Sequence, residues 1–309
     1  MFRMPGVLLL AVGAIVLGAG TAAAADTTPW QVKTASNSYG SNRANYSYTL
    51  AAGGEVQDAF VVLNRGKTPL ELAVYAGDAF TTPDGELDLR GSDSKDLGTW
   101  VHADRKQVKV LPGKSVEVPF KIAVPADARP GDHLGGVITS LTQNDVERRL
   151  AIRIRLRVSG ELKPSLAVED LKVRYSGSLL GNGDATVAYE IRNTGNTIAA
   201  ARQTASVSGP FGRLKAQSGG IADSPQLLPG ETWKVSVPVE GVTPAGRLTG
   251  AVELLPLVTD AAGSTATFAA VETTAHAWTI PWPLLLLLVL VAAGAVLVIR
   301  RVRGAILRK

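Results

Sequence analysis

The stretch LNRGKT at residues 63–68 returns as RNTGNT at residues 192–197, so the pattern N-x-G-x-T occurs in both halves of the chain. In each half an apolar run precedes this pattern, and the sequences LPGKS (111–115) and LPGET (228–232) follow it. A Val-Pro step and a corner containing Pro and Gly come next in both copies. Shared features in a shared order indicate that one module is present twice.

This module has the local signals of a β-sandwich. Apolar and polar residues alternate in 117–124 and 150–158, as they do in half-buried strands, and turn residues recur between such runs. We expect Asn-x-Gly to form a tight turn with a left-handed residue, Pro-Gly to form a type II turn, and each Val-Pro strand to lie at a sheet edge. The fold prediction is therefore all-β, with tandem immunoglobulin-like sandwiches at 26–160 and 161–277.

Composition excludes several classes of function. The 309-residue chain has no cysteine, which excludes disulfide scaffolds, thiol nucleophiles and cysteine-ligated metals. Its formal net charge is +5, but six of the 32 Lys and Arg residues lie at the chain ends, and residues 26–277 hold 26 basic and 27 acidic residues. A nucleic-acid-binding protein would gather its basic residues on the folded part, so no nucleic-acid partner is expected.

Both chain ends have the patterns of targeting segments. Residues 1–25 combine an early arginine, an apolar run and small residues before the end, which predicts a secretory signal peptide. Ile280–Ile299 carries no charge and would span about 30 Å as a helix. Two tryptophans at its start and the basic residues of 300–309 predict a transmembrane helix at 278–299 with a cytoplasmic tail. The expected location is the cell membrane, with the ectodomain extracellular and the lipid bilayer as a partner.

Between Trp30 and Ser159 the first half contains a set of short motifs in a fixed order: YSYTL (46–50), GG (53–54), NRG (64–66), TPDG (82–85), Trp100, LPG (111–113), Pro125 and GDHLGG (131–136). With these motifs in order, it resembles the peptidoglycan-binding domain of the WxL-interacting protein family. That family is similar in plan: a signal peptide, this domain, a second sandwich that engages partners, one membrane helix and a basic tail. The resemblance implies a cell-wall-associated surface protein of a Gram-positive organism that binds peptidoglycan or an associated wall polymer. The second half is shorter than the family's second domain.

Four arginines form the polar pattern best suited to binding a ligand. Side chains alternate across a strand, so one face of 147–158 would carry the arginines while the intervening apolar residues enter the core. A row of guanidinium groups could bind the phosphates of teichoic acids or the carboxylates of peptidoglycan stem peptides. The alternative is an outward strand face that keeps a sheet edge soluble. The arginines are Arg149, Arg153, Arg155 and Arg157.

Aromatic residues provide a second candidate site. Sugar rings pack on exposed aromatic faces, because both surfaces are apolar. Tyr39 lies in the polar stretch 36–45 and Trp100 is isolated from other tryptophans, so both are candidate ligand-binding residues. A single tryptophan in a sandwich is also commonly part of its core.

No catalytic residues are predicted. The chain has three histidines and lacks a nucleophile elbow, a zinc-protease helix motif and a phosphate-binding loop, so no enzyme activity, cofactor or metal is expected. The main hypothesis is a non-enzymatic, membrane-anchored protein whose first sandwich binds peptidoglycan or a wall polymer. The alternative is a structural scaffold or spacer that recruits or presents another secreted protein through its β-sandwiches.

Overall fold

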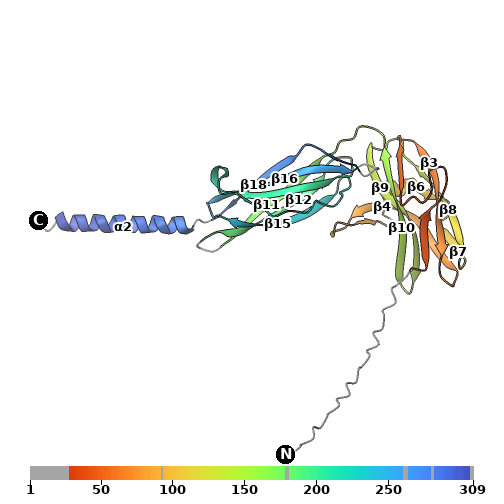
Figure 1. Ribbon diagram of the computed structural model, residues 1–309, viewed down its shortest axis with the longest axis horizontal. Coiled ribbons are helices and arrows are strands. Elements are labelled where there is room, and N and C mark those ends of the chain that lie inside the picture. The colour runs from red at the N-terminus through yellow and green to blue at the C-terminus, as the bar shows by residue number, and fades with distance from the viewer. Residues whose placement is uncertain (1–27, 92, 178–180, 260–263, 280–281, 307–309) are drawn as a thin grey trace, which may run out of the picture.

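The computed structural model describes residues 28–91, 93–177, 181–259, 264–279 and 282–306. It confirms the predicted fold class: two β-sandwiches of the immunoglobulin type follow one another, and helix α2 (Trp282–Ile306) comes last (Figure 1). The predicted signal peptide, 1–25, lies outside the described residues.

The first sandwich consists of two sheets, and the first two strands of the chain belong to different sheets. The chain enters one sheet with its first strand and the other sheet with its second, so the segment between them crosses from one sheet to the other. One sheet has the order β1 (Trp30–Thr34), β3 (Glu55–Asn64), β8 (Ser115–Ala123), β6 (Val101–Ala103). The other has the order β2 (Tyr46–Leu50), β10 (Val146–Val158), β9 (Gly131–Gln143), β4 (Leu70–Thr81), β5 (Leu87–Leu89), with β7 (Gln107–Val110) also on β4 and helix α1 (Leu97–Trp100) after β5.

The core of this sandwich lies between the two sheets and is rich in aromatic residues. The rings of Tyr46 and Phe120 are fully buried and meet edge to face, with centroids 5.0 Å apart. On β10 the apolar residues Ile152, Ile154 and Leu156 point into this core, as the alternation predicts. The intervening arginines therefore lie on the outer face of the sheet.

The second sandwich repeats the architecture with a smaller core. Its buried side chains include Tyr189, Ile191, Leu227 and Leu248. One sheet has the order β11 (Leu166–Ser176), β12 (Gly183–Asn193), β15 (Thr232–Val242). The other has the order β14 (Ala216–Gln217), β13 (Ala200–Ser208), β16 (Arg247–Thr259), β17 (Thr265–Thr267), with β18 (Val271–Trp278) also on β16 and the 3-10 turn η1 (Pro210–Gly212) between β13 and β14.

The repeated sequence forms the same corner in both sandwiches. The Asn64 side chain is buried and donates hydrogen bonds to the carbonyls of Thr68 and Val110. Asn193 is equally buried and donates to the carbonyls of Thr197 and Leu227. In each corner the asparagine Oδ1 accepts the N–H of the glycine two residues later. The repeat is therefore a structural joint between one strand and the Leu-Pro-Gly turn.

Two of the expectations for local backbone structure need correction. Neither asparagine nor the glycine two residues later has a positive φ, because the asparagine side chain, rather than a left-handed residue, closes the corner. The Pro-Gly turns are as predicted, with φ of +67° at Gly113 and +84° at Gly230. Pro238 lies in β15 at a sheet edge, but Pro119 lies in β8 between β3 and the three-residue β6.

The membrane prediction is also corrected. In the part of the chain that the structure describes, no helix combines the length and the apolar character that a membrane crossing needs. The single-pass transmembrane helix expected at 278–299, its span Ile280–Ile299 in a lipid bilayer, and the location inferred from it are therefore wrong.

Candidate functional site

The four predicted arginines share the outer face of β10, but the structure divides them into two pairs. Arg157 donates two hydrogen bonds to Asp132 of the adjacent β9, from Nε at 2.7 Å and from Nη2 at 2.9 Å. Arg155 donates to the same carboxylate at 3.2 Å. The Asp132 side chain has no exposed surface, so these two guanidinium groups neutralise a buried charge. Arg155 and Arg157 therefore stabilise the fold by pairing with a buried carboxylate.

Asp132 also joins the two sandwiches. Its Oδ2 accepts the backbone N–H of Ile198 in the second sandwich at 3.1 Å, and Arg155 donates to the Thr259 carbonyl at 3.2 Å. Burial raises the pKa of Asp132. The hydrogen bonds from Arg157 and Ile198 and the charges of Arg155 and Arg157 outweigh burial, so the net shift of this pKa is downward. The carboxylate is therefore ionised at neutral pH and binds groups from both domains.

Asn196 holds the chain segment that connects the sandwiches. Its side chain donates to the carbonyls of Pro130 and Glu161 and accepts the N–H of Lys163. Its backbone carbonyl accepts the N–H of Asp132 at 2.8 Å. One residue of the repeated N-x-G-x-T pattern thus binds the first sandwich and the linker together.

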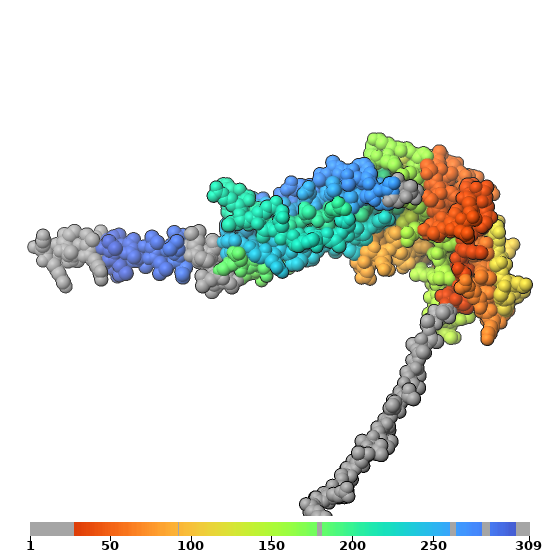
Figure 2. Space-filling model, in the orientation of Figure 1, coloured from red at the N-terminus to blue at the C-terminus, as the bar shows by residue number. Residues whose placement is uncertain are grey.

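A buried apolar cluster and a long hairpin complete the contact between the domains. The cluster consists of Ala79 and Leu134 from the first sandwich and Ile198 and Leu228 from the second. The hairpin of β4 and β5 reaches over the second sandwich, as the orange surface against the cyan and blue one shows in Figure 2. Beside its turn, the N–H and hydroxyl groups of Thr81 donate to the Glu231 carboxylate. The two sandwiches are therefore fixed at an angle, with the outer face of β10 on the inner side of the bend.

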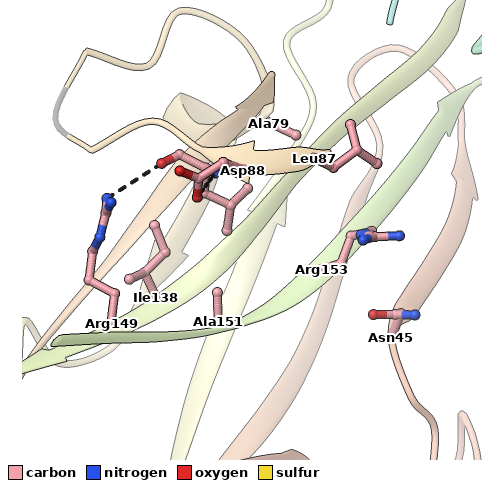
Figure 3. Close-up of a pocket in the computed structure, with 9 residues that line it drawn as sticks. Asn45, Ala79, Leu87, Asp88, Ile138, Arg149, Ala151 and Arg153 are labelled. Carbon is pink, nitrogen blue, oxygen red and sulfur yellow. Dashed lines mark hydrogen bonds between the residues drawn. The ribbon is translucent and has the colours of Figure 1, made fainter. Parts of the chain in front are cut away.

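The other two arginines, Arg149 and Arg153, line an open groove on that inner side (Figure 3). Arg149 makes a long hydrogen bond of 3.5 Å to the carbonyl of Leu89 and also lies against the hydroxyl group of Tyr75. Arg153 is exposed and has no hydrogen-bond or ion-pair partner among the described residues. The groove has a volume of about 260 Å³, and a hollow of about 310 Å³ that shares Asn45, Leu87 and Arg153 continues toward the second sandwich.

The β10 strand also has a free edge beside these arginines. The edge strand β2 pairs with β10 only from Ile154 to Val158. Between Val146 and Arg153, no described strand pairs with β10 on that side. The two-residue turn at Asn144 and Asp145 makes Val146 a hydrogen-bonded partner of β9, so the odd-numbered residues direct their N–H and C=O groups to the free edge.

A second groove borders this edge on the inner side of the sandwich. It has a volume of about 720 Å³ and lies between β1 and β10, and its lining includes Trp30, Val32 and Leu150. The free edge of β10 is therefore flanked by an arginine-lined groove on one face and a partly apolar groove on the other. A peptide strand added to the edge would direct alternate side chains into the two grooves.

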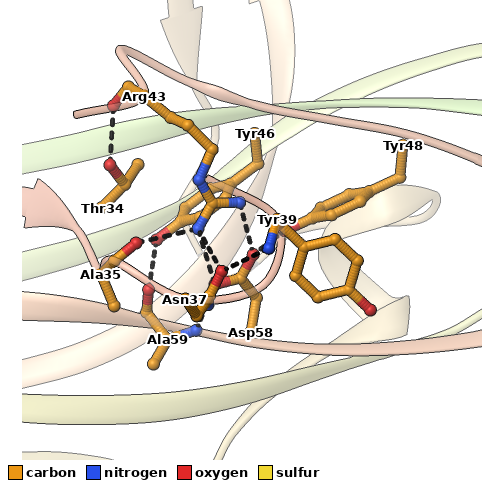
Figure 4. A network of polar contacts seen from close by, with 9 residues as sticks. All are labelled: Thr34, Ala35, Asn37, Tyr39, Arg43, Tyr46, Tyr48, Asp58 and Ala59. Atoms are coloured by element: carbon orange, nitrogen blue, oxygen red, sulfur yellow. Dashed lines mark hydrogen bonds and ion pairs between the residues drawn. The ribbon is translucent and has the colours of Figure 1, made fainter. Parts of the chain in front are cut away.

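Tyr39 lies apart from this edge, in the segment that crosses between the sheets (Figure 4). Tyr39 is 52% exposed, and its ring packs edge-on against that of Tyr48, at 5.9 Å between centroids. The segment is held by Asp58, whose buried carboxylate accepts hydrogen bonds from Arg43, Asn37 and Tyr48. Burial raises the pKa of Asp58, but the hydrogen bonds from Arg43 and Tyr48 outweigh it and lower the pKa.

Trp100 is not available to a ligand. It is only 8% exposed, and its ring packs against that of His133 at 4.7 Å between centroids. His133 in turn forms an ion pair with Asp96, with Nδ1 2.7 Å from Oδ2. Within the described residues, no group of three metal-ligating side chains that could hold a metal ion is found.

The ion pair of His133 leads to a prediction about pH. Burial lowers the pKa of His133, but the hydrogen bond and charge of Asp96 outweigh it, so the pKa in the folded protein is raised above 6.5. The resulting stabilisation is complete below about pH 6.5 and is lost as the pH rises through the folded-state pKa. We therefore expect the free energy of unfolding, measured by urea titration, to fall over this range more in the natural protein than in His133→Gln.

The matched control for this prediction is His102→Gln, because His102 is exposed on β6. This variant should keep the pH dependence of the natural protein. An identical pH dependence in His133→Gln would show that the ion pair contributes nothing to it.

The sequence analysis did not predict the free edge of β10 or the role of Asp132. An acidic residue directly before the apolar run of β9 was a signal for the buried carboxylate. The free edge had no signal, because the point where β2 stops pairing with β10 is set by the register of two strands about a hundred residues apart. Of the six predicted residues, the structure brings only Arg149 and Arg153 to this edge.

No family model and no curated protein matches the chain. Its fold is similar to solved structures of fimbrial chaperones. One is from a chaperone–tip adhesin complex of CFA/I fimbriae, with 10% identity, 80% of this chain and 98% of that chain covered, and a TM-score of 0.42. Another is the Class 5 fimbriae chaperone CfaA, with 9% identity, 79% and 98% covered, and a TM-score of 0.40. A third is the complex of the Salmonella enterica SafA pilin with the SafB chaperone, with 12% identity, 81% and 98% covered, and a TM-score of 0.32.

These findings overturn the identification as a WxL-interacting protein, and with it the expected binding of peptidoglycan or a wall polymer at a Gram-positive cell surface. The physical reason is that the motifs behind the resemblance form the fold. The Asn64 corner recurs in the second sandwich, and Trp100 belongs to the core. A Cβ atom at Gly135 would lie 2.5 Å from the Gly77 carbonyl, so this glycine serves strand packing.

Proposed function

We propose that this chain is a non-enzymatic protein that recruits another polypeptide by adding an extended segment of it to the free edge of β10. The observation that carries the proposal is the unpaired edge of β10 from Val146 to Arg153. This edge lies between the arginine-lined groove on the inner side of the bend and the partly apolar groove between β1 and β10. An added strand gains affinity from main-chain hydrogen bonds and specificity from side chains that enter the flanking grooves. In this proposal the second sandwich acts as a fixed arm beside the edge.

We also propose that the two modules occupy residues 26–160 and 161–277 and that residues 1–25 are a signal peptide. Export would bring the edge to other exported chains, and the absence of cysteine leaves the fold independent of disulfide formation. Arg155 and Arg157 act as positioning residues in this scheme, because they hold Asp132 and thereby the angle between the domains.

Ala151→Pro should test the edge directly. The Ala151 N–H points to the free edge, so proline removes a donor that an added strand needs while the β9 ladder keeps its hydrogen bonds. With synthetic peptides in which valine alternates with threonine, glutamate or lysine, we expect Ala151→Pro to bind at least about tenfold more weakly than the natural chain. Fluorescence anisotropy of labelled peptides measures this difference.

Ala151→Ser is the matched control, because it keeps the N–H and the small side chain. Hydrogen exchange adds a second readout: a bound peptide should protect the amides of Arg149, Ala151 and Arg153. If the peptides bind Ala151→Pro as well as the natural chain and protect none of these amides, strand addition at this edge is wrong.

A further inference from the structure

We infer that the partner segment carries acidic side chains at positions i and i+4 of its added strand, facing Arg149 and Arg153, and apolar side chains at the positions between that face inward. This inference rests on the proposed function, because it assumes a strand along the free edge of β10. It specifies the chemistry of the segment that this edge would select.

The spacing follows from the geometry of paired strands. Arg149 and Arg153 lie on the same face of β10, four residues apart, with Ala151 between them. Four residues of strand span about 13 Å. Residues directly opposite each other on paired strands project to the same face, so the guest residues that meet these arginines are also four apart. The guest residue opposite Ala151 meets only a methyl group.

The charge requirement follows from what the arginines already contact. Two arginines farther along the same row are neutralised by Asp132, whereas Arg153 has no partner among the described residues. Arg149 contacts the Leu89 carbonyl at 3.5 Å and the uncharged hydroxyl group of Tyr75. Neither guanidinium group in the groove therefore donates to a carboxylate of the described residues. Carboxylates are the acceptors that match the paired N–H groups of an arginine.

Acidic residues of the chain itself only partly offset this charge. Asp88 lines the groove, and its carboxylate accepts the N–H of Leu89. Glu147 lies one step farther along the same face and accepts a hydrogen bond from Tyr75 at 3.2 Å. Both acids engage groups other than Arg153, so a carboxylate of the guest strand would be the first to reach this guanidinium.

The opposite face of the guest strand would meet a groove that is partly apolar. This groove of about 720 Å³ is lined by the partly buried Val32 and Leu150, and also by the polar side chains of Gln31 and Arg65 at its border. Guest side chains at i+1 and i+3 would point into this groove, where apolar groups gain from burial. The combined pattern is an acidic residue, an apolar residue, any residue, an apolar residue and an acidic residue.

The test uses the full chain and three synthetic peptides in which valine alternates with glutamate, threonine or lysine. The glutamate peptide should bind about threefold to thirtyfold more tightly than the threonine peptide, and the lysine peptide should bind most weakly. The preference should shrink as the salt concentration rises, because exposed charges are screened. In Arg149→Glu/Arg153→Glu the order should reverse in favour of the lysine peptide. Arg105→Glu, at an exposed position between β6 and β7, is the matched control and should keep the original order.

The outcomes separate this inference from the proposed function. If all three peptides bind equally and Ala151→Pro weakens all of them, the acidic preference is overturned and strand addition stands. If the glutamate peptide is preferred but Ala151→Pro binds it unchanged, the arginines bind carboxylates without strand addition, and both ideas are overturned. Inorganic polyphosphate that displaces the glutamate peptide, together with an unaffected Ala151→Pro, would show an anion groove rather than a peptide edge.

Discussion

Replacing Asp132 by alanine should lower the free energy of unfolding by about 3–5 kcal/mol and release the second sandwich from its fixed angle. The expected loss is large because the side chain is fully buried and its removal leaves the charges of Arg155 and Arg157 without a partner. The same change removes the acceptor for the Ile198 N–H, so it breaks a contact within the first sandwich and a contact between the sandwiches together. Urea denaturation measures the first effect.

The second effect is measured as a distance between the domains. Because the chain has no cysteine, spin labels can be placed uniquely with Gln57→Cys in the first sandwich and Lys234→Cys in the second, both at exposed positions. Asp132→Ala should broaden the distance distribution between the labels. Asp104→Ala, at an exposed position, should change stability by less than about 0.5 kcal/mol and leave the distribution narrow. A narrow distribution in Asp132→Ala would mean that the other contacts, those of Asn196, Thr81 and the apolar cluster, fix the angle without this carboxylate.

Asp58→Asn should also destabilise the protein strongly, by about 3–5 kcal/mol, but without changing the angle between the domains. Asp58 accepts two hydrogen bonds from Arg43, and the side chains are 0% and 16% exposed. The amide removes the charge that Arg43 needs and places an NH₂ group where an acceptor is required. The segment 36–45 should then open, and its cleavage by a protease should become faster.

A double-mutant cycle separates the ion pair from the rest of the network. Asp58→Asn/Arg43→Met should recover part of the stability lost in Asp58→Asn, because the unpaired buried charge is gone. Glu71→Gln, on an exposed carboxylate, is the control and should be nearly neutral. If Asp58→Asn costs less than about 1 kcal/mol, the carboxylate is not what holds the crossing segment.

The acid sensitivity of the fold should come from the same two carboxylates. The pKa values of Asp58 and Asp132 are both lowered in the folded protein relative to 3.8. Their stabilisation is therefore present above about pH 3.8 and is lost as the pH falls through the lower folded-state values. Below this pH, the free energy of unfolding should fall less steeply in Asp58→Asn and in Asp132→Ala than in the natural protein.

Much of the fold could be predicted because its signals are local. Alternation along β10 assigns Ile152, Ile154 and Leu156 to the core, and the structure buries all three. The repeated corner could be recognised because each copy builds its hydrogen bonds from a short stretch of sequence around Asn64 or Asn193. The same locality explains the wrong family identification, since corners and turns of this kind form sandwiches whatever the protein binds.

By itself, the sequence determined the all-β class, the duplication and the face of β10 that carries the arginines. Only the tertiary structure decided that Asp132 neutralises two of these arginines, that the other two face a groove, and that β2 leaves part of β10 unpaired. The physical reason is that a side chain's face follows from a period of two residues along one strand. Its partner and the free edge beside it depend on the register between strands that are distant in the sequence.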